Sequence, residues 1–338
     1  MPMQDQMTDF QHAKAIVRAC GEALDTATPD AVAEVLSQFT AKDWSWRGTH
    51  PFGRQQGAEA VAAAFWTPLK RAIHRLQRRP DIFFAGSAKG EPTGVWVVET
   101  GHFLGLFDAP WLGVRPTSRI AMLRYVEFHR VEADRIAETT MFADILNLMW
   151  QAGQYPLPPP TAAHLITPGP MRHDGLLYER QDPARGEATM TAIEKLLANE
   201  IAAKDPDEAQ KLAKVWHDDM IWWGPGGIGA TYTIARYVEQ HCKPFDDGLR
   251  HSGQPGDALC RVAEGDFGGF FGWSNYKLQS TGGYLGMTAG VNCADMPFVD
   301  LYRAEAGKLA ENWVFIDVLG FLAAQGLDAI RRMPTTSC

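Results

Sequence analysis

Two aspartates in matching surroundings are the strongest candidates for chemistry. Asp144 lies in the run Met141-Phe-Ala-Asp-Ile-Leu, and Asp317 lies in Val314-Phe-Ile-Asp-Val-Leu. An apolar setting disfavours the charged form of a carboxyl group, so its pKa rises toward neutral pH. Such a group can take up and return a proton as a general acid or base. Each aspartate could also cap the helix expected after it, and the two interpretations are compatible.

A second carboxylate is expected beside Asp317. A hairpin turn near Ala306 would place Asp295 across the ladder from Asp317, and Met122 across from Asp144 in the equivalent position. Two carboxylates a few ångströms apart share a proton, which raises one of the two pKa values. The pairing depends on the register of the hairpin, since a slip of one residue turns the side chain to the other face.

Polar and aromatic residues on the expected strands are candidates for binding a ligand. His102 lies in the alternating run Glu99-Thr-Gly-His-Phe-Leu, where it is either a pocket-facing hydrogen-bonding group or an ordinary sheet histidine. Tryptophans on a short strand either line a small-molecule pocket or fill the core. The candidate binding residues are Trp46, His50, Trp222, Trp223, Asn275 and Tyr302.

These candidates come in pairs because the sequence repeats itself. KDWSWRGTHPFG (42–53) aligns with DDMIWWGPGGIG (218–229) at an offset of 176, and RIAETTMFADIL (135–146) aligns with KLAENWVFIDVL (308–319) at an offset of 173. Colinear matches without gaps over such runs indicate a duplicated domain. We expect one domain over residues 10–152, a second over 187–332, and a Pro-rich spacer over 153–186.

The same order of elements is expected in each copy. Helical patterns come first, then strand-like runs rich in Val, Phe and Thr, then a hairpin and a short apolar helix; this order is typical of an α+β fold. Basic residues between Lys70 and Arg79 are interpreted as the end of a helix. The helices are expected at 13–24, 30–39, 58–71 and 145–152, and at 187–203, 207–217, 234–244 and 318–325.

The closing segment carries a family resemblance. ENWVFIDVLGFLAAQG (311–326) resembles the last strand and helix of SnoaL-like polyketide cyclases, of the nuclear transport factor 2-like superfamily. WLGVRPTSR (111–119) is similar to that family's Leu-Gly and Pro-Thr-Gly loop, with Ser118 in place of the glycine. The resemblance implies two tandem cone-shaped domains, each a curved antiparallel sheet wrapped by about three helices around a pocket. It implies the acid–base role for Asp144 and Asp317, and a substrate contact for His129, which otherwise reads as a solvent-facing hairpin residue.

Three functions are compatible with these residues. The first is acid–base catalysis without a cofactor on a small enolisable carbonyl or polyketide-like substrate, of the cyclase, aldolase, isomerase or dehydratase type. The second is a small-molecule-binding module without turnover, since fold does not settle function. The third is epoxide hydrolysis by Arg303 with Asp300 and Asp317. The second copy is favoured as the active one because its closing motif matches the family better.

Composition limits the partners. The net charge is −8, nearly all of it in residues 166–338, which argues against nucleic acid or an anionic membrane as partner. No apolar run is long enough to span a bilayer, and the polar start lacks the pattern of a secretory signal, so a cytoplasmic protein is expected. Five scattered cysteines predict neither a disulfide framework nor a metal site. We expect a small-molecule ligand, no metal or cofactor, and pairing of the two copies as an internal pseudo-dimer, with or without a homodimer of the chain.

Overall fold

The computed structural model describes residues 3–88, 94–164, 166–198, 207–252, 260–274 and 276–331, and it describes the side chains from residue 10 onward. The chain divides into two compact units, here called the first and second domains. The first consists of Met1–Tyr155, Pro168–Arg180 and Ile330–Cys338, and the second of Pro156–Thr167 and Gln181–Ala329. The Pro-rich segment is therefore shared between the two. No helix in the described ranges has the length and apolar character needed to cross a membrane.

The first domain opens with helices and closes with a short one, as its sequence predicts. A π-helical turn, η1, interrupts its third helical segment. In chain order the elements are α1 (Met3–Thr26), α2 (Val32–Phe39), β1 (Thr40–Gly48), β2 (Gly53–Gln56), α3 (Ala58–Val61), η1 (Ala62–Trp66), α4 (Thr67–Ala72), β3 (Ile73–Gly86), β4 (Val95–Phe107), β5 (Ile120–Glu132), β6 (Arg135–Ala143) and α5 (Ile145–Gln151).

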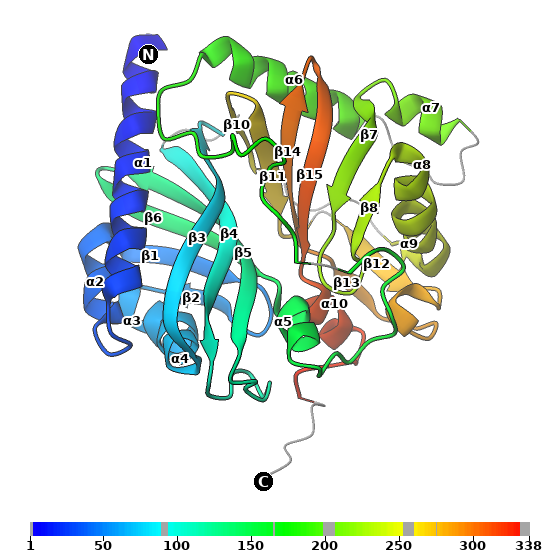
Figure 1. Cartoon of the computed structure of the whole chain (residues 1–338), viewed down its shortest axis with the longest axis horizontal. Coiled ribbons are helices and arrows are strands. Elements are labelled where there is room, and N and C mark those ends of the chain that lie inside the picture. Colours follow the sequence, from blue (N-terminus) through cyan, green and yellow to red (C-terminus); the bar gives the residue numbers. More distant parts are fainter. Residues whose placement is uncertain are drawn as a thin grey trace. The chain divides into compact units, whose positions relative to one another are not determined.

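These strands form one six-stranded sheet in the order β2-β1-β6-β5-β4-β3, with α1 packed along one face (Figure 1). The sheet is mixed, which corrects the expected purely antiparallel arrangement: β6 runs parallel to β1, whereas the other neighbours are antiparallel. This parallel pairing is possible because the helical segment and four strands, β2 to β5, separate β1 from β6 along the chain, whereas a direct hairpin would make the two antiparallel.

The second domain repeats this plan. Its elements are α6 (Pro183–Ala198), α7 (Glu208–Leu212), β7 (Trp216–Trp223), β8 (Ala230–Tyr232), α8 (Ile234–Tyr237), η2 (Val238–Cys242), α9 (Lys243–Gly248), β9 (Leu249–His251), β10 (Cys260–Glu264), β11 (Phe267–Gly272), β12 (Lys277–Ser280), η3 (Tyr284–Gly286), β13 (Cys293–Asp295), β14 (Phe298–Glu305), β15 (Lys308–Ile316) and α10 (Val318–Ala324). The main sheet has the order β10-β11-β14-β15-β7-β8, again with one parallel pair, β15 with β7. The α+β class with two copies of one domain is confirmed.

One difference between the two sheets bears on the site. In the first domain β3, β4 and β5 run unbroken, whereas in the second the equivalent outer halves, β9, β12 and β13, form a separate three-stranded sheet. Pro297 stands at the break between β13 and β14, where the first domain has Arg124 inside β5. Proline has no N–H to donate to a ladder, so it favours the end of a strand over its interior.

Two helix ends differ from expectation. The helix expected at 58–71 does end at Ala72, but the basic residues as far as Arg79, interpreted as part of its end, lie on β3, which begins at Ile73. The helix expected to reach residue 217 ends at Leu212, because the aromatic and apolar residues from Trp216 onward enter β7. The predicted helix end after Ala198 lies outside the described residues.

Candidate functional site

A buried ion-pair cluster fills the interior of the first domain. Nη1 of Arg78 lies 2.5 Å from Oε1 of Glu99 and 2.7 Å from Oε2 of Glu127. The hydroxyl of Tyr125 donates to the same Glu99 oxygen at 2.5 Å. Strands β3, β4 and β5 supply these groups side by side, and the side chains of Arg78 and Glu127 are only 8% and 3% exposed.

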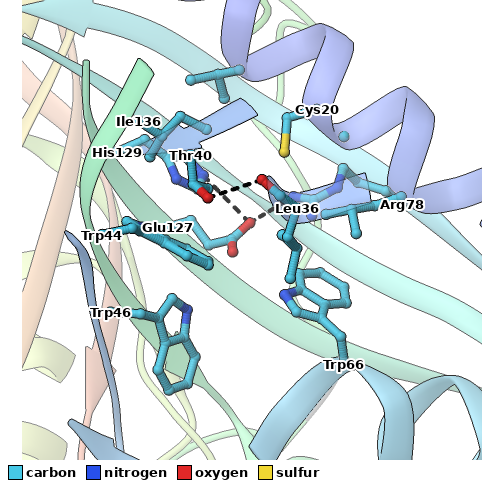
Figure 2. Close-up of a pocket in the computed structure, with 13 residues that line it drawn as sticks. Cys20, Leu36, Thr40, Trp44, Trp46, Trp66, Arg78, Glu127, His129 and Ile136 are labelled. Carbon is cyan, nitrogen blue, oxygen red and sulfur yellow. Dashed lines mark hydrogen bonds and ion pairs between the residues drawn. The ribbon is translucent and has the colours of Figure 1, made fainter. Parts of the chain in front are cut away.

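Three further side chains extend the cluster across the sheet. Nδ1 of His129 lies 3.0 Å from the hydroxyl oxygen of Thr139, which also accepts a hydrogen bond from the indole N–H of Trp44 at 3.0 Å. Nε2 of His129 lies 3.6 Å from Glu127. Figure 2 shows Glu127 between His129 and Arg78, with Trp44, Trp46 and Trp66 around it. His129 is therefore a buried member of a polar network, and the solvent-facing alternative is wrong.

The charges of this cluster compensate one another. Burial acts to raise the pKa of Glu127, but Arg78 and His129 outweigh it and lower that pKa to about 2. Burial acts to lower the pKa of Arg78, and Glu99 and Glu127 raise it above its ordinary value. The lowered pKa of Glu127 favours its ionised form, which suits a structural ion pair better than proton transfer.

The cavity beside this cluster is small. It has a volume of about 20 Å³, room for roughly one water molecule. Trp46 and Trp66 are almost fully buried in its wall and occupy the space that an organic ligand would need. The space beside this cluster is thus too small for an organic ligand.

The second domain holds a carboxyl group in a different setting. Asp300, on β14, accepts a hydrogen bond from the side-chain amide of Asn312 at 3.1 Å and another from Tyr302. Asn312 also donates to the carbonyl of Leu301 at 3.0 Å and is 2% exposed, so its orientation is fixed. Burial raises the pKa of Asp300 to about 6, although both hydrogen bonds act to lower it. A carboxyl group with that pKa exchanges protons near neutral pH.

Aromatic rings surround Asp300. Phe298 stacks on Tyr276 at a centroid distance of 5.1 Å, and Tyr302 packs against Trp216 at 5.7 Å. Tyr237 lies close enough for the charge of Asp300 to act on its hydroxyl, and burial raises the pKa of that hydroxyl. Tyr276 is 39% exposed and marks a side that solvent reaches. Asp300 thus lies among aromatic side chains, beside a ring that is partly exposed.

The repeat shows how the two interiors diverged. Stacked rings occupy the same two positions in both domains, with the hydroxyl exchanged between them: Phe103 on Tyr125 at 4.0 Å, and Tyr276 on Phe298. The polar groups differ, and at the offset of 173 the equivalent pairs are Glu99 and Gly272, Glu127 and Asp300, His129 and Tyr302, and Thr139 and Asn312. At the offset of 176, which applies to the earlier part of the repeat, Arg78 aligns with Gln254, and Gln254 lies outside the described residues. Asp300 is bonded by an amide and a hydroxyl where Glu127 is bonded by a guanidinium.

Both predicted catalytic aspartates are helix caps. The carboxylate of Asp144 accepts from the backbone N–H of Asn147 at 3.1 Å, and that of Asp317 from the N–H of Gly320 at 2.9 Å. The capping interpretation is therefore confirmed for both. Asp144 is also buried. Burial of Arg124 lowers the pKa of its guanidinium to about 10, and the negative charge of Asp144 acts against that decrease.

Two other predictions are wrong because of strand geometry. Asp295 pairs with Lys277 in the three-stranded sheet and accepts from the hydroxyl of Ser274, so it does not face Asp317. The hairpin register is shifted by two residues from the expected one, and Pro297 binds the N–H of Asp317 instead. The corresponding partner of Asp144 is Arg124, where Met122 was expected.

His102 lies on the other face of the sheet from the cluster. Side chains alternate along β4, which places Glu99 and Phe103 on one face and His102 on the other. There its Nδ1 lies 3.1 Å from Asp81. His102 is thus a sheet histidine with a carboxylate partner, and the pocket-facing interpretation is wrong. Its counterpart Asn275 lies outside the described residues.

The predicted aromatic residues divide between two faces. Trp46 lines the small cavity, and Trp222 and Tyr302 lie in the interior of the second domain. Trp223 alternates to the opposite face, where it contacts Tyr232, and His50 is half-buried in the turn after β1.

The set proposed for epoxide hydrolysis does not assemble. Arg303 binds Glu311 at 2.5 Å and Glu305 at 2.7 Å, on the face of β14 opposite Asp300. In the part of the chain that the structure describes, no three His, Cys, Asp or Glu side chains are grouped as a metal site. The sequence patterns did not identify Arg78 as a core residue or Asp300 as a proton-exchanging carboxyl group, although the alternation Phe298, Asp300, Tyr302 was a usable signal.

No protein-family model matches this chain, and no curated protein does. Similar solved structures include IdmH from Streptomyces antibioticus, a candidate polyketide cyclase, at 18% identity over 41% of this chain and 96% of its own, with a TM-score of 0.34. Another is a candidate SnoaL-like polyketide cyclase from Jannaschia sp. CCS1, at 21% identity over 44% and 94%, with a TM-score of 0.32. A third is an NTF2-like protein from Burkholderia xenovorans LB400, at 15% identity over 41% and 97%, with a TM-score of 0.33.

Proposed function

We propose that the second domain carries out acid–base catalysis on a small enolisable carbonyl compound, with Asp300 as the proton-transferring group. The observation that carries this proposal is the setting of Asp300: a carboxyl group inside an aromatic surround, bonded by the neutral side chains Asn312 and Tyr302. No counter-charge among these partners holds the group permanently ionised, in contrast to Glu127 in the first domain.

The chemistry follows from the two protonation states of Asp300. As a carboxylate it takes the proton from the carbon next to the substrate carbonyl. The electron pair of the broken C–H bond then moves toward the carbonyl oxygen and forms an enolate. As a carboxylic acid it returns that proton to the same carbon or to another. Asn312 holds the carboxyl oxygen in place through both steps, because its amide is itself fixed by Leu301. The flanking rings of Tyr276 and Phe298 would orient a planar substrate over the carboxyl group.

The predicted aspartate Asp317 is the competing catalyst. Its carboxylate is already bound to the N–H of Gly320 at the start of α10. A binding module without turnover is the competing function, in which the same aromatic interior holds a ligand and Asp300 only hydrogen-bonds to it. Substitution of each carboxyl group by its amide separates these cases, since shape is kept and proton transfer is lost.

The test uses 2-tetralone in D₂O and follows deuterium uptake at the carbon next to its carbonyl by NMR. We expect the wild-type chain to accelerate exchange, and D300N to lose that acceleration by about 100-fold or more, the usual contribution of a positioned acid or base. E127Q is the matched control at the equivalent position of the first domain, and it should retain exchange, as should D317N. Loss in D317N with retention in D300N would transfer the role to Asp317, and a wild-type chain that binds the ketone without exchange would establish the binding module.

A further inference from the structure

One half-buried histidine of the second domain has a buried ring nitrogen that the packing of the fold does not explain. His241 lies on the π-turn η2, and its ring stacks on Trp222 at a centroid distance of 4.0 Å with 23° between the planes. Tyr237 packs on it at 5.3 Å. Its Nδ1 atom is buried and, among the residues that the structure describes, has no hydrogen-bond partner. Burial of an unpaired polar atom costs free energy of folding, so its retention calls for another reason.

The first domain shows what the fold itself requires at this place. The equivalent residue at the offset of 176 is Phe65, which lies on the π-turn η1 and packs against Trp46 at 5.8 Å and Trp66 at 5.1 Å. A phenyl ring therefore satisfies the same turn and the same tryptophan partner. The nitrogen atoms of His241 add nothing to that packing. π-turns and local departures from stable packing are both concentrated at functional sites.

His241 stands on the same interior face as Asp300. Trp222, on which it stacks, is the register partner of Asn312 on the adjacent strand, and Asn312 donates to Asp300. Tyr237 gives a second route, since it contacts His241 and is influenced by the charge of Asp300. One side chain on the η2 turn and one on β14 thus face the aromatic interior from different elements.

We propose that His241 binds the oxygen atom of the ligand in the second domain, and so selects ring compounds that carry a carbonyl or hydroxyl oxygen. The role rests on the proposed function of that interior, whose proton-transferring group is Asp300. Burial lowers the pKa of His241 to about 3, so the imidazole is neutral and presents Nδ1 as a donor to a carbonyl or as an acceptor from a hydroxyl, according to tautomer.

The test compares 2-tetralone with tetralin, which has the same ring skeleton without the oxygen. Binding is followed by tryptophan fluorescence of the full chain. We expect the wild-type protein to bind the ketone about tenfold more tightly than the hydrocarbon, and H241F to lose that preference while its tetralin affinity stays unchanged. Retained ketone preference in H241F, or equal affinities in the wild-type protein, overturns the proposal. D300N should keep the preference and lose α-proton exchange, so failure of the catalytic role and failure of the His241 role give different results.

A second measurement needs no ligand. Removal of the unpaired nitrogen should raise the thermal midpoint of H241F by about 2–4 °C, since a phenyl ring already fits this turn in the first domain. The reciprocal variant F65H should lower the midpoint. A fall in the midpoint of H241F would assign the histidine a structural role and overturn the proposal. H241L gives a smaller apolar side chain for the same comparison.

Discussion

Two equivalent carboxyl groups acquire opposite properties from their immediate neighbours. Glu127 and Asp300 occupy the same position of the repeat, and burial acts on both in the same direction. Arg78 and His129 lower the pKa of the first to about 2, whereas burial beside only an amide and a hydroxyl raises the pKa of the second to about 6. The type of partner, more than the depth of burial, decides which domain can exchange protons near neutral pH.

Stability should report the state of Asp300. Its folded pKa lies above its unfolded value, so the folded domain binds the proton more tightly and loses stability as pH rises from about 4 to about 6. D300N has no such loss. We expect its thermal midpoint to match that of the wild-type chain at pH 4 and to exceed it at pH 7, by an amount equivalent to about 3 kcal/mol at most. Circular dichroism at both pH values checks this, and equal midpoints at pH 7 would contradict it.

Arg78 should be the most sensitive single position of the first domain. R78A leaves Glu99 and Glu127 buried without their cation, and loss of one partner of a buried ion pair typically costs about 3–5 kcal/mol. Chemical denaturation should show that loss. The control R71A removes an exposed ion pair with Asp30 and should change stability by less than about 1 kcal/mol. A small effect of R78A would mean that the two glutamates are protonated or hydrated in the folded state.

At the scale of elements, the last strand and helix of each copy meet at a capping aspartate. The two caps differ in what surrounds them, because Asp144 also faces the buried Arg124 while Pro297 takes the equivalent position in the second domain. The same sequence motif therefore supports a helix end in both copies and a charge pair in one.

The two caps should differ in cost. D317A removes one hydrogen bond to the start of α10 and should destabilise the chain by about 1 kcal/mol. D144A removes the equivalent bond and also the carboxylate beside Arg124, so we expect about 2–4 kcal/mol. Urea unfolding of the two variants measures the difference, and equal losses would show that Arg124 does not depend on Asp144.

The strand break should be visible in backbone dynamics. The three-stranded sheet of the second domain consists of strands of three or four residues, whereas the equivalent stretches of the first domain continue long central strands. Short ladders open at lower free energy. Hydrogen–deuterium exchange should therefore be faster at residues 277–280 and 293–295 than at 104–107 and 120–122. Equal protection would mean that side-chain packing holds the small sheet as firmly as a continuous strand.

At the scale of the whole molecule, the sequence allows prediction of the order of elements and of the duplicated domain. It does not allow prediction of which side chains meet in the candidate site. The repeat, the α+β class and the hairpin turn at Ala306 follow from local patterns, and the structure confirms them. The site depends on which face each side chain takes, and this depends on register. A two-residue shift in one hairpin places Asp295 away from Asp317, and alternation along β4 places His102 on the opposite face from the buried cluster. Pairing of the two copies with each other stays a prediction.

The two π-turns and the tryptophans that pack on them allow the two copies of the domain to be compared position by position. Phe65 and His241 occupy the same position of the two copies within one chain, so the aligned pair compares two side chains in one architecture. A residue that both copies share is explained by the requirements of the fold. A polar atom that only one copy has needs an explanation other than the fold. A single sequence thereby carries part of the information that an alignment of relatives would otherwise supply.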